Sequence, residues 1–229
     1  MDSEILIGLL KIILINIVLS GDNAVVIALA CRNLDKRYQK KAVFFGTFGA
    51  IALRVALTFV AVYLLTIPFL NLVGGILLLW IAISLLKGGD EEDIKASSNL
   101  MGAIKTIIVA DLVMSLDNVV AVAGAANGNN LLVLLGLAIS IPLIIWGSQL
   151  LMKLMERFPI IVTAGAALLG YTAGEMMLKD HAIENLLESL SPIIHQGVPI
   201  LFAVLVVIVG KVSGMSKKEK EKDELLNVN

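Results

Sequence analysis

Residues 18–28 read VLSGDNAVVIA, and residues 113–123 read VMSLDNVVAVA. Both stretches carry a Ser-x-Asp-Asn motif, Ser20 to Asn23 and Ser115 to Asn118, inside apolar segments that lie 95 residues apart. Apolar matches are common between membrane segments, but ionisable side chains within such segments are rare and usually functional. We therefore interpret the two stretches as equivalent parts of an internal repeat.

The composition indicates a membrane protein. The chain has 229 residues, of which 58% are hydrophobic and only 16% are charged, and its mean hydropathy is +0.92. A soluble domain has about 45–50% apolar and roughly 25% charged residues. Because a helix needs about 20 apolar residues to cross a bilayer, we predict an all-α, polytopic membrane protein with seven transmembrane helices. Their expected ranges are 5–31, 43–65, 69–86, 101–126, 131–152, 160–178 and 197–212.

The distribution of basic residues predicts the orientation. Lys and Arg gather in the first, third and fifth links and in the C-terminal tail, whereas the opposite links hold only Lys179. Basic links face the cytoplasm, so we expect the N-terminus outside and the C-terminus inside. Three spans separate the two motifs, which therefore run through the bilayer in opposite directions. This arrangement is a 3+3 inverted repeat plus a seventh helix, an organisation typical of secondary transporters.

The expected segments follow from this topology. They are a first three-helix repeat (1–86), an acidic cytoplasmic linker (87–100), a second, inverted repeat (101–178), an outer amphipathic link (179–196), the seventh helix (197–212) and a charged cytoplasmic tail (213–229).

Polar residues within the spans predict a metal site near the midplane. At about 1.5 Å per residue, Asp22 and Asp111 both lie roughly 14–15 Å above the inner ends of their spans. Asp and Asn oxygens suit hard divalent cations such as Mg²⁺, Ca²⁺ or Mn²⁺. The predicted ligands are Asp22, Asn23, Asp111, Asp117 and Asn118, and the secondary candidates are Asn16, Ser20, Ser115, Met114 and Glu175.

Arg54 is the basic residue placed most deeply among the predicted spans, level with Asp22. Two interpretations are open: a buried ion pair that holds the empty site, or a charge that replaces the metal after release.

Other site classes find little support. A net charge of −1 offers no basic surface for nucleic acid, and the single Cys31 allows no internal disulfide.

The Ser-Gly-Asp-Asn-Ala and Ser-Leu-Asp-Asn-Val pair, in the first and fourth of seven spans, resembles the TerC family over about residues 5–212. This family of bacterial membrane proteins is named for tellurium resistance and belongs to the wider LysE-type exporter superfamily. The resemblance implies a bacterial plasma-membrane protein that exports manganese and supplies it to secreted metalloenzymes or their export machinery. It also implies that the family's intramembrane acidic residues correspond to Asp22, Asp111 and Asp117, with Asn23 and Asn118 beside them.

The leading functional hypothesis is a transporter, not an enzyme, that exports Mn²⁺ by alternating access to one midplane site. Uptake of a proton by Asp22 or Asp111 when the metal leaves is one way to drive export. One alternative is an intramembrane aspartyl protease with an Asp22–Asp117 dyad, although an Asn after each Asp adds ligand oxygens without an obvious use in a dyad. Another alternative is a membrane partner protein that affects metal levels indirectly. A homo-oligomer is compatible with the sequence.

Overall fold

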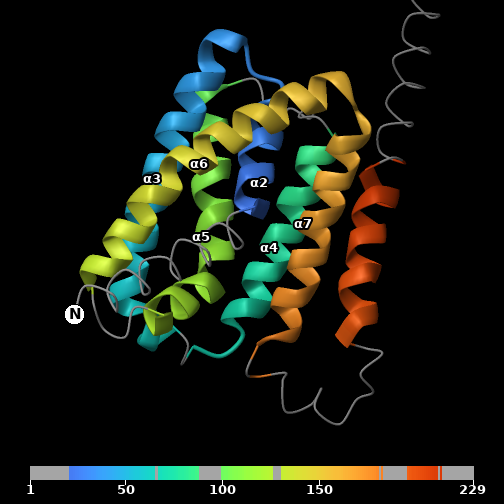
Figure 1. Ribbon diagram of the computed structural model, residues 1–229. Helices are drawn as coiled ribbons and strands as arrows, with labels where there is room; N and C mark the ends of the chain where they lie inside the picture. The colour runs from blue at the N-terminus through green and yellow to red at the C-terminus, as the bar shows by residue number, and fades with distance from the viewer. Residues whose placement is uncertain are drawn as a thin grey trace, which may run out of the picture.

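The computed structural model describes residues 21–64, 67–87, 99–125, 130–180, 182, 195–210 and 212 (Figure 1). Within the helices, the side chains of residues 58–59, 61–62, 64, 117–125, 130–134, 136–138 and 140 also lie outside the description. The described residues form seven helices and no strand. These helices are α2 (Gly21–Cys31), α3 (Lys36–Leu64), α4 (Leu70–Lys87), α5 (Leu100–Ala125), α6 (Asn130–Arg157), α7 (Ile160–Leu178) and the helix His195–Gly210, here called the last helix.

The helix positions confirm the all-helical prediction, with two differences at the helix ends. α3 begins at Lys36, seven residues before the predicted start, because Asp35 caps it: the backbone N–H of Arg37 donates to Asp35 Oδ1 at 3.0 Å. α6 continues to Arg157, beyond the predicted end at residue 152. In both cases the helix extends past its apolar stretch into charged residues. A prediction based on hydropathy finds the apolar part of such a helix and leaves out its charged terminal turns.

Several predicted segments lie mostly or wholly outside the described residues. Of the predicted first span, only residues 21–31 are described. Most of the acidic linker, most of the outer amphipathic link and the whole charged tail also fall outside.

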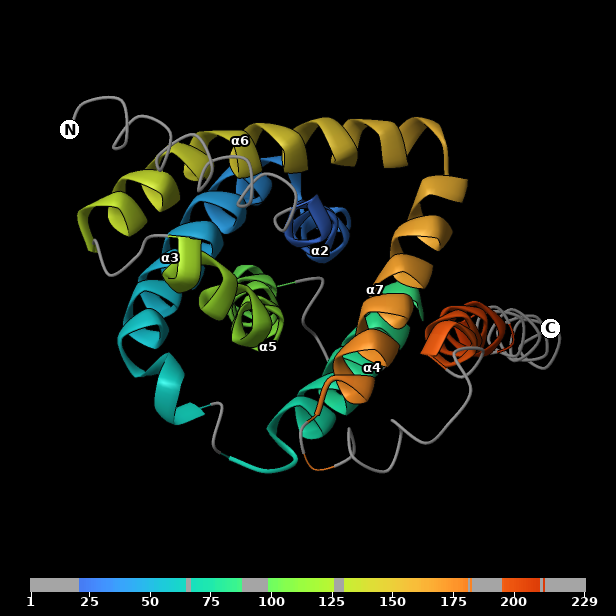
Figure 2. The ribbon, with the colours of Figure 1, turned by 60° about the horizontal axis from the view of Figure 1, so that its bottom comes forward.

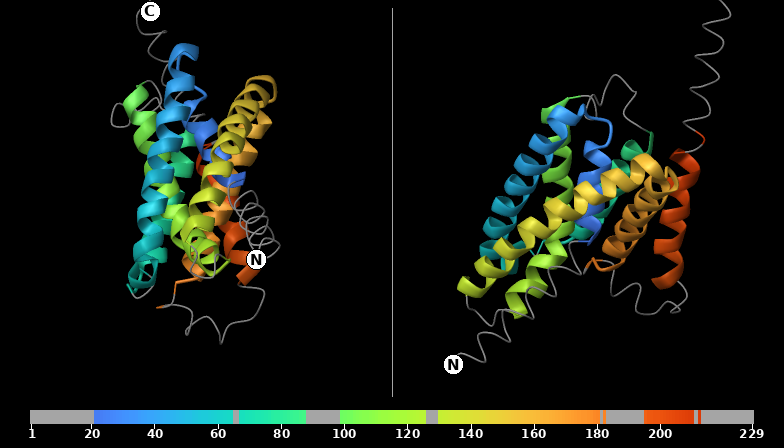
Figure 3. Two further views of the ribbon diagram at one scale, coloured as in Figure 1. Left: turned by 60° about the vertical axis from the view of Figure 1, so that its left-hand side comes forward. Right: turned by 45° about the horizontal axis from the view of Figure 1, so that its top comes forward.

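α2 and α5, the two helices that carry the repeated motif, occupy the centre of the bundle. In the view of Figure 2 they are surrounded by α3, α6 and the pair formed by α4 and α7. α2 contacts α3, α4, α5, α6 and α7, and eight of its eleven residues are buried. The last helix stands outside this group beside α7 (Figure 3).

Glycines bring helices into backbone contact. A Cβ added at Gly75 of α4 would lie 2.8 Å from the carbonyl oxygen of Ala173 in α7. A Cβ at Gly170 of α7 would lie 2.8 Å from the carbonyl oxygen of Phe202 in the last helix. Small residues at such positions are typical of helix packing in membranes, and here they hold α4, α7 and the last helix together.

Asp180, which follows α7, ties the end of that helix to the start of α4. The backbone N–H groups of Phe69 and Leu72 donate to its Oδ1 at 3.2 Å and to its Oδ2 at 3.0 Å, and the N–H of Ala182 donates to Oδ1 at 2.9 Å. Burial opposes the charged form, but these donors together hold the pKa of Asp180 below its ordinary value. Phe69 adopts a positive φ of 62° at this junction. This contact cannot be predicted from the sequence, because a cap supplied from over a hundred residues away leaves no local pattern.

The outer surface is strongly apolar. Two described helices, α4 and α7, are long and apolar enough by length and composition to cross a membrane. Large side chains project outward with half or more of their surface exposed, and they include Phe48, Tyr63, Trp80, Trp146 and Ile208. An apolar surface of this extent indicates contact with a partner or with lipid.

Candidate metal site

The centre of the bundle holds a buried ion pair between Arg54 of α3 and Asp111 of α5. Nη2 of Arg54 donates to Oδ1 of Asp111 at 2.6 Å, and the two side chains are 4% and 11% exposed. The fully buried Ser115 closes the group, since its Oγ accepts from Nε of Arg54 at 2.8 Å and donates to Oδ2 of Asp111 at 3.1 Å. One guanidinium, one carboxylate and one hydroxyl therefore satisfy each other in the interior.

Close packing of α3 on α5 positions this group. A Cβ at Gly46 of α3 would lie 2.7 Å from Ile107 of α5, and one at Gly49 would lie 2.7 Å from Ile108. Asp111 and Ser115 follow one and two turns beyond Ile107 on the same face of α5. The small residues of α3 thus let the two backbones approach until Arg54 reaches the polar face of α5.

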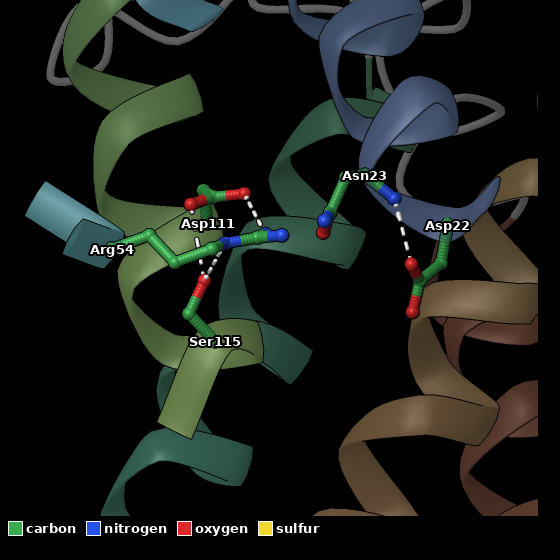
Figure 4. A network of polar contacts seen from close by, with 5 residues as sticks. All are labelled: Asp22, Asn23, Arg54, Asp111 and Ser115. Atoms are coloured by element: carbon green, nitrogen blue, oxygen red, sulfur yellow. Dashed lines mark hydrogen bonds and ion pairs between the residues drawn. The ribbon is translucent and has the colours of Figure 1, made fainter. Parts of the chain in front are cut away.

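α2 brings Asp22 and Asn23 to the same region. The backbone N–H of Asn23 donates to Oδ1 of Asp22 at 2.8 Å. Arg54 and Asp111 lie close enough to Asp22 for their charges to act on its carboxylate. Figure 4 shows the Asn23 amide directed from α2 towards the Arg54–Asp111 pair. Asn23 of the first motif therefore faces the polar group that includes Ser115 from the second motif.

The side chain of Asn23 is buried and makes no hydrogen bond to the described residues. It is 3% exposed, and neither Oδ1 nor Nδ2 has a partner in the described part of the chain. A buried amide that lacks partners costs about 1–3 kcal/mol, and buried polar groups in proteins are nearly always satisfied. An amide left in this condition beside two carboxylates is what a site for a cation or another polar ligand would provide.

Not all predicted site residues can be placed. Asn16 and Ser20 lie outside the described residues, and Asp117 and Asn118 belong to α5 but their side chains lie outside the description. Met114 packs in the apolar core, and Glu175 is half-buried near the end of α7. Among the described residues, no three side chains of His, Cys, Asp or Glu come together as a metal site. The described site therefore consists of two carboxylates, one amide, the Ser115 hydroxyl and Arg54.

A family comparison is decisive for the class of this protein. The sequence model described as "Integral membrane protein TerC family" matches residues 1–220. The chain belongs to the TerC family. This result confirms the resemblance drawn from the duplicated motif, and it assigns the apolar exterior of the TerC bundle to the lipid bilayer.

Individual relatives of this TerC chain are bacterial membrane proteins. YjbE of Bacillus subtilis is 46% identical over 211 residues, which cover 89% of this chain and 97% of YjbE. YkoY of the same organism is 26% identical, with 86% of this chain and 68% of YkoY covered. The inner membrane protein YgdQ of Escherichia coli is 27% identical, with 64% of this chain and 69% of YgdQ covered. No solved structure matches the chain.

Proposed function

We propose that this TerC protein is a divalent-cation transporter that exports Mn²⁺ from the cytoplasm through a midplane site between α2 and α5. The observation that carries the proposal is the side-chain amide of Asn23, which has no hydrogen-bond partner among the described residues, is buried next to Asp22 in the chain and is directed towards the Arg54–Asp111 pair. Two carboxylates offset a divalent charge, and an amide oxygen adds a neutral ligand of the kind such ions accept. Asp117 and Asn118 complete the proposed ligand set.

The helix packing supports an inverted repeat. If α2, α3 and α4 correspond to α5, α6 and α7, each contact between the two sets of three helices has an expected counterpart. α3 packs on α5 as α6 packs on α2, and α4 packs on α5 as α7 packs on α2. The corresponding helices also meet directly, since α2 contacts α5, α3 contacts α6 and α4 contacts α7. In transporters built in this way, the substrate site lies where the two repeats meet, which here is the α2–α5 contact.

The proposed orientation is multi-pass in the bacterial plasma membrane, with the N-terminus outside and the C-terminus inside. The polar ends of the helices are compatible with it. The basic start of α3 and the end of α6 lie at one end of the bundle, where Lys36 approaches Glu156 at 4.0 Å. The Asp180 contact joins the start of α4 to the end of α7, and both of these ends are outside in the proposed orientation. Ca²⁺ and Mg²⁺ share the oxygen chemistry and serve as competitors in the test below.

Transport by the purified protein tests the proposal. Vesicles containing the full chain are loaded with radioactive ⁵⁴Mn²⁺, and its net release is measured with Ca²⁺ or Mg²⁺ as competitors. We expect release by the wild-type protein, and loss of release in Asp22→Asn and Asp117→Asn. Asp35→Asn is the matched control, since it removes a carboxylate at the exposed cap of α3 and Asn is an equally good cap. Wild-type vesicles that release no more ⁵⁴Mn²⁺ than protein-free vesicles would contradict the proposal.

A further inference from the structure

Arg54 already pairs with Asp111, one of the proposed metal ligands. Both oxygens of Asp111 are engaged, Oδ1 by Nη2 of Arg54 at 2.6 Å and Oδ2 by the hydroxyl of Ser115 at 3.1 Å. The same hydroxyl accepts from Nε of Arg54, so two hydrogen bonds from the guanidinium and one between Ser115 and Asp111 hold the group together. A metal ion cannot become the main partner of Asp111 while this arrangement is intact.

A guanidinium and a divalent cation on one buried carboxylate repel each other strongly, because a site shielded from water screens charge poorly. A buried carboxylate with neither partner is also unfavourable, because breaking a buried ion pair leaves an uncompensated charge. Asp111 is therefore stable with one cation at a time. The Asn23 amide, which has no partner within the described ranges, lies on the α2 side of the pair, where a second cation would approach.

We propose that Arg54 is a built-in competitor of the transported cation. In the empty transporter its guanidinium neutralises Asp111, the incoming metal displaces it, and it returns to Asp111 when the metal leaves. Asp111 is then neutralised by Arg54, and needs no other cation, while the empty site changes its exposure from one side of the membrane to the other. This inference rests on the proposed export function and specifies how the unloaded transporter resets.

Net efflux and metal-for-metal exchange are two modes of transport. Comparing them separates the proposed role of Arg54 from a purely structural role. Net efflux requires the empty site to reorient, whereas exchange of ⁵⁴Mn²⁺ for unlabelled Mn²⁺ across the vesicle membrane uses only loaded states. For Arg54→Gln we expect net efflux to fall by about tenfold or more, because an uncompensated charge must cross the apolar interior. We expect exchange to continue, and Mn²⁺ to bind about tenfold more tightly because no competitor must be displaced.

Two further variants sharpen the test. Arg54→Lys keeps the charge and should retain both net efflux and exchange. Arg37→Gln is the matched control, since it removes an exposed arginine from the same helix and should change neither mode. An Arg54→Gln variant that retains full net efflux would overturn the proposal, as would loss of exchange in that variant when it folds normally. If the wild-type protein moves Mn²⁺ in neither mode, the export function itself is wrong.

Ser115→Ala extends the test if Arg54→Gln does not fold. This change removes the hydroxyl that bridges Arg54 and Asp111 but leaves both charges in place. We expect the Mn²⁺ dissociation constant, measured by titration calorimetry, to decrease severalfold because the competing pair is weakened. An unchanged or increased dissociation constant would overturn the proposal, and an increase would assign Ser115 to the ligands instead.

Discussion

The Arg54–Asp111 pair should show strong energetic coupling in the metal-free protein. The perturbation is a double-mutant cycle of Arg54→Met, Asp111→Leu and the double variant. At the observed 2.6 Å, two unit charges attract by about 6 kcal/mol at an effective dielectric constant of about 20. Because both side chains are nearly buried, each single variant removes the opposite charge from the interior charge that remains and should lose about 3–5 kcal/mol of unfolding free energy.

The double variant removes both charges and should lose much less than the sum of the single losses. We expect a coupling energy of at least about 2 kcal/mol. Unfolding by sodium dodecyl sulfate in mixed micelles, with a chelator present, measures the four free energies. Arg37→Met, an exposed change on the same helix, should alter stability by less than about 0.5 kcal/mol. Single losses that add within about 0.5 kcal/mol would refute the reasoning, because independent sites behave in this way.

Three further predictions concern other contacts. Asn23→Leu should raise metal-free stability by about 1–3 kcal/mol, since it removes a buried amide that no described residue satisfies, and it should abolish stabilisation by Mn²⁺ in thermal melts; a metal-free loss of stability would contradict this. Asp180→Asn should lower stability by about 1–3 kcal/mol near neutral pH. Because its folded pKa lies below the ordinary 3.8, the stabilisation is complete above that value, and the difference between variant and wild type should shrink in melts below it. A difference independent of pH would exclude a charged cap. Gly75→Ala should separate α4 from α7 and lower the melting temperature, because its Cβ would lie 2.6 Å from Met177, whereas Gly147→Ala, with 3.9 Å of room, should be neutral; equal effects would contradict close packing at Gly75.

The sequence predicted the helices and the polar centre because both depend on local patterns. Long apolar runs specify helices in a bilayer, since all backbone groups must be satisfied within the segment. The repeated Ser-x-Asp-Asn motif marked the two central helices, and counting residues along the spans put Asp22, Asp111 and Arg54 at one depth. The structure brings Arg54 and Asp111 into contact and places both within electrostatic reach of Asp22.

Features that depend on how helices meet could not be derived in this way. The choice of Asp111 and Ser115 as partners of Arg54 follows from the close approach of α3 to α5 at Gly46 and Gly49. The depth of Arg54 in its span places it level with Asp22, but depth does not tell whether Asp22 or Asp111 is its partner. The capping of α4 by Asp180 likewise depends on the pairing of α4 with α7.

Anomalous X-ray scattering at the manganese absorption edge, from crystals of the full chain grown with Mn²⁺, tests the central claim most directly. We predict one strong peak at the α2–α5 contact, within ligand distance of Asp22, the Asn23 amide oxygen and Asp111, with the Arg54 guanidinium moved away from Asp111. A peak elsewhere, or a centre without manganese and with the Arg54–Asp111 pair unchanged, would contradict the account.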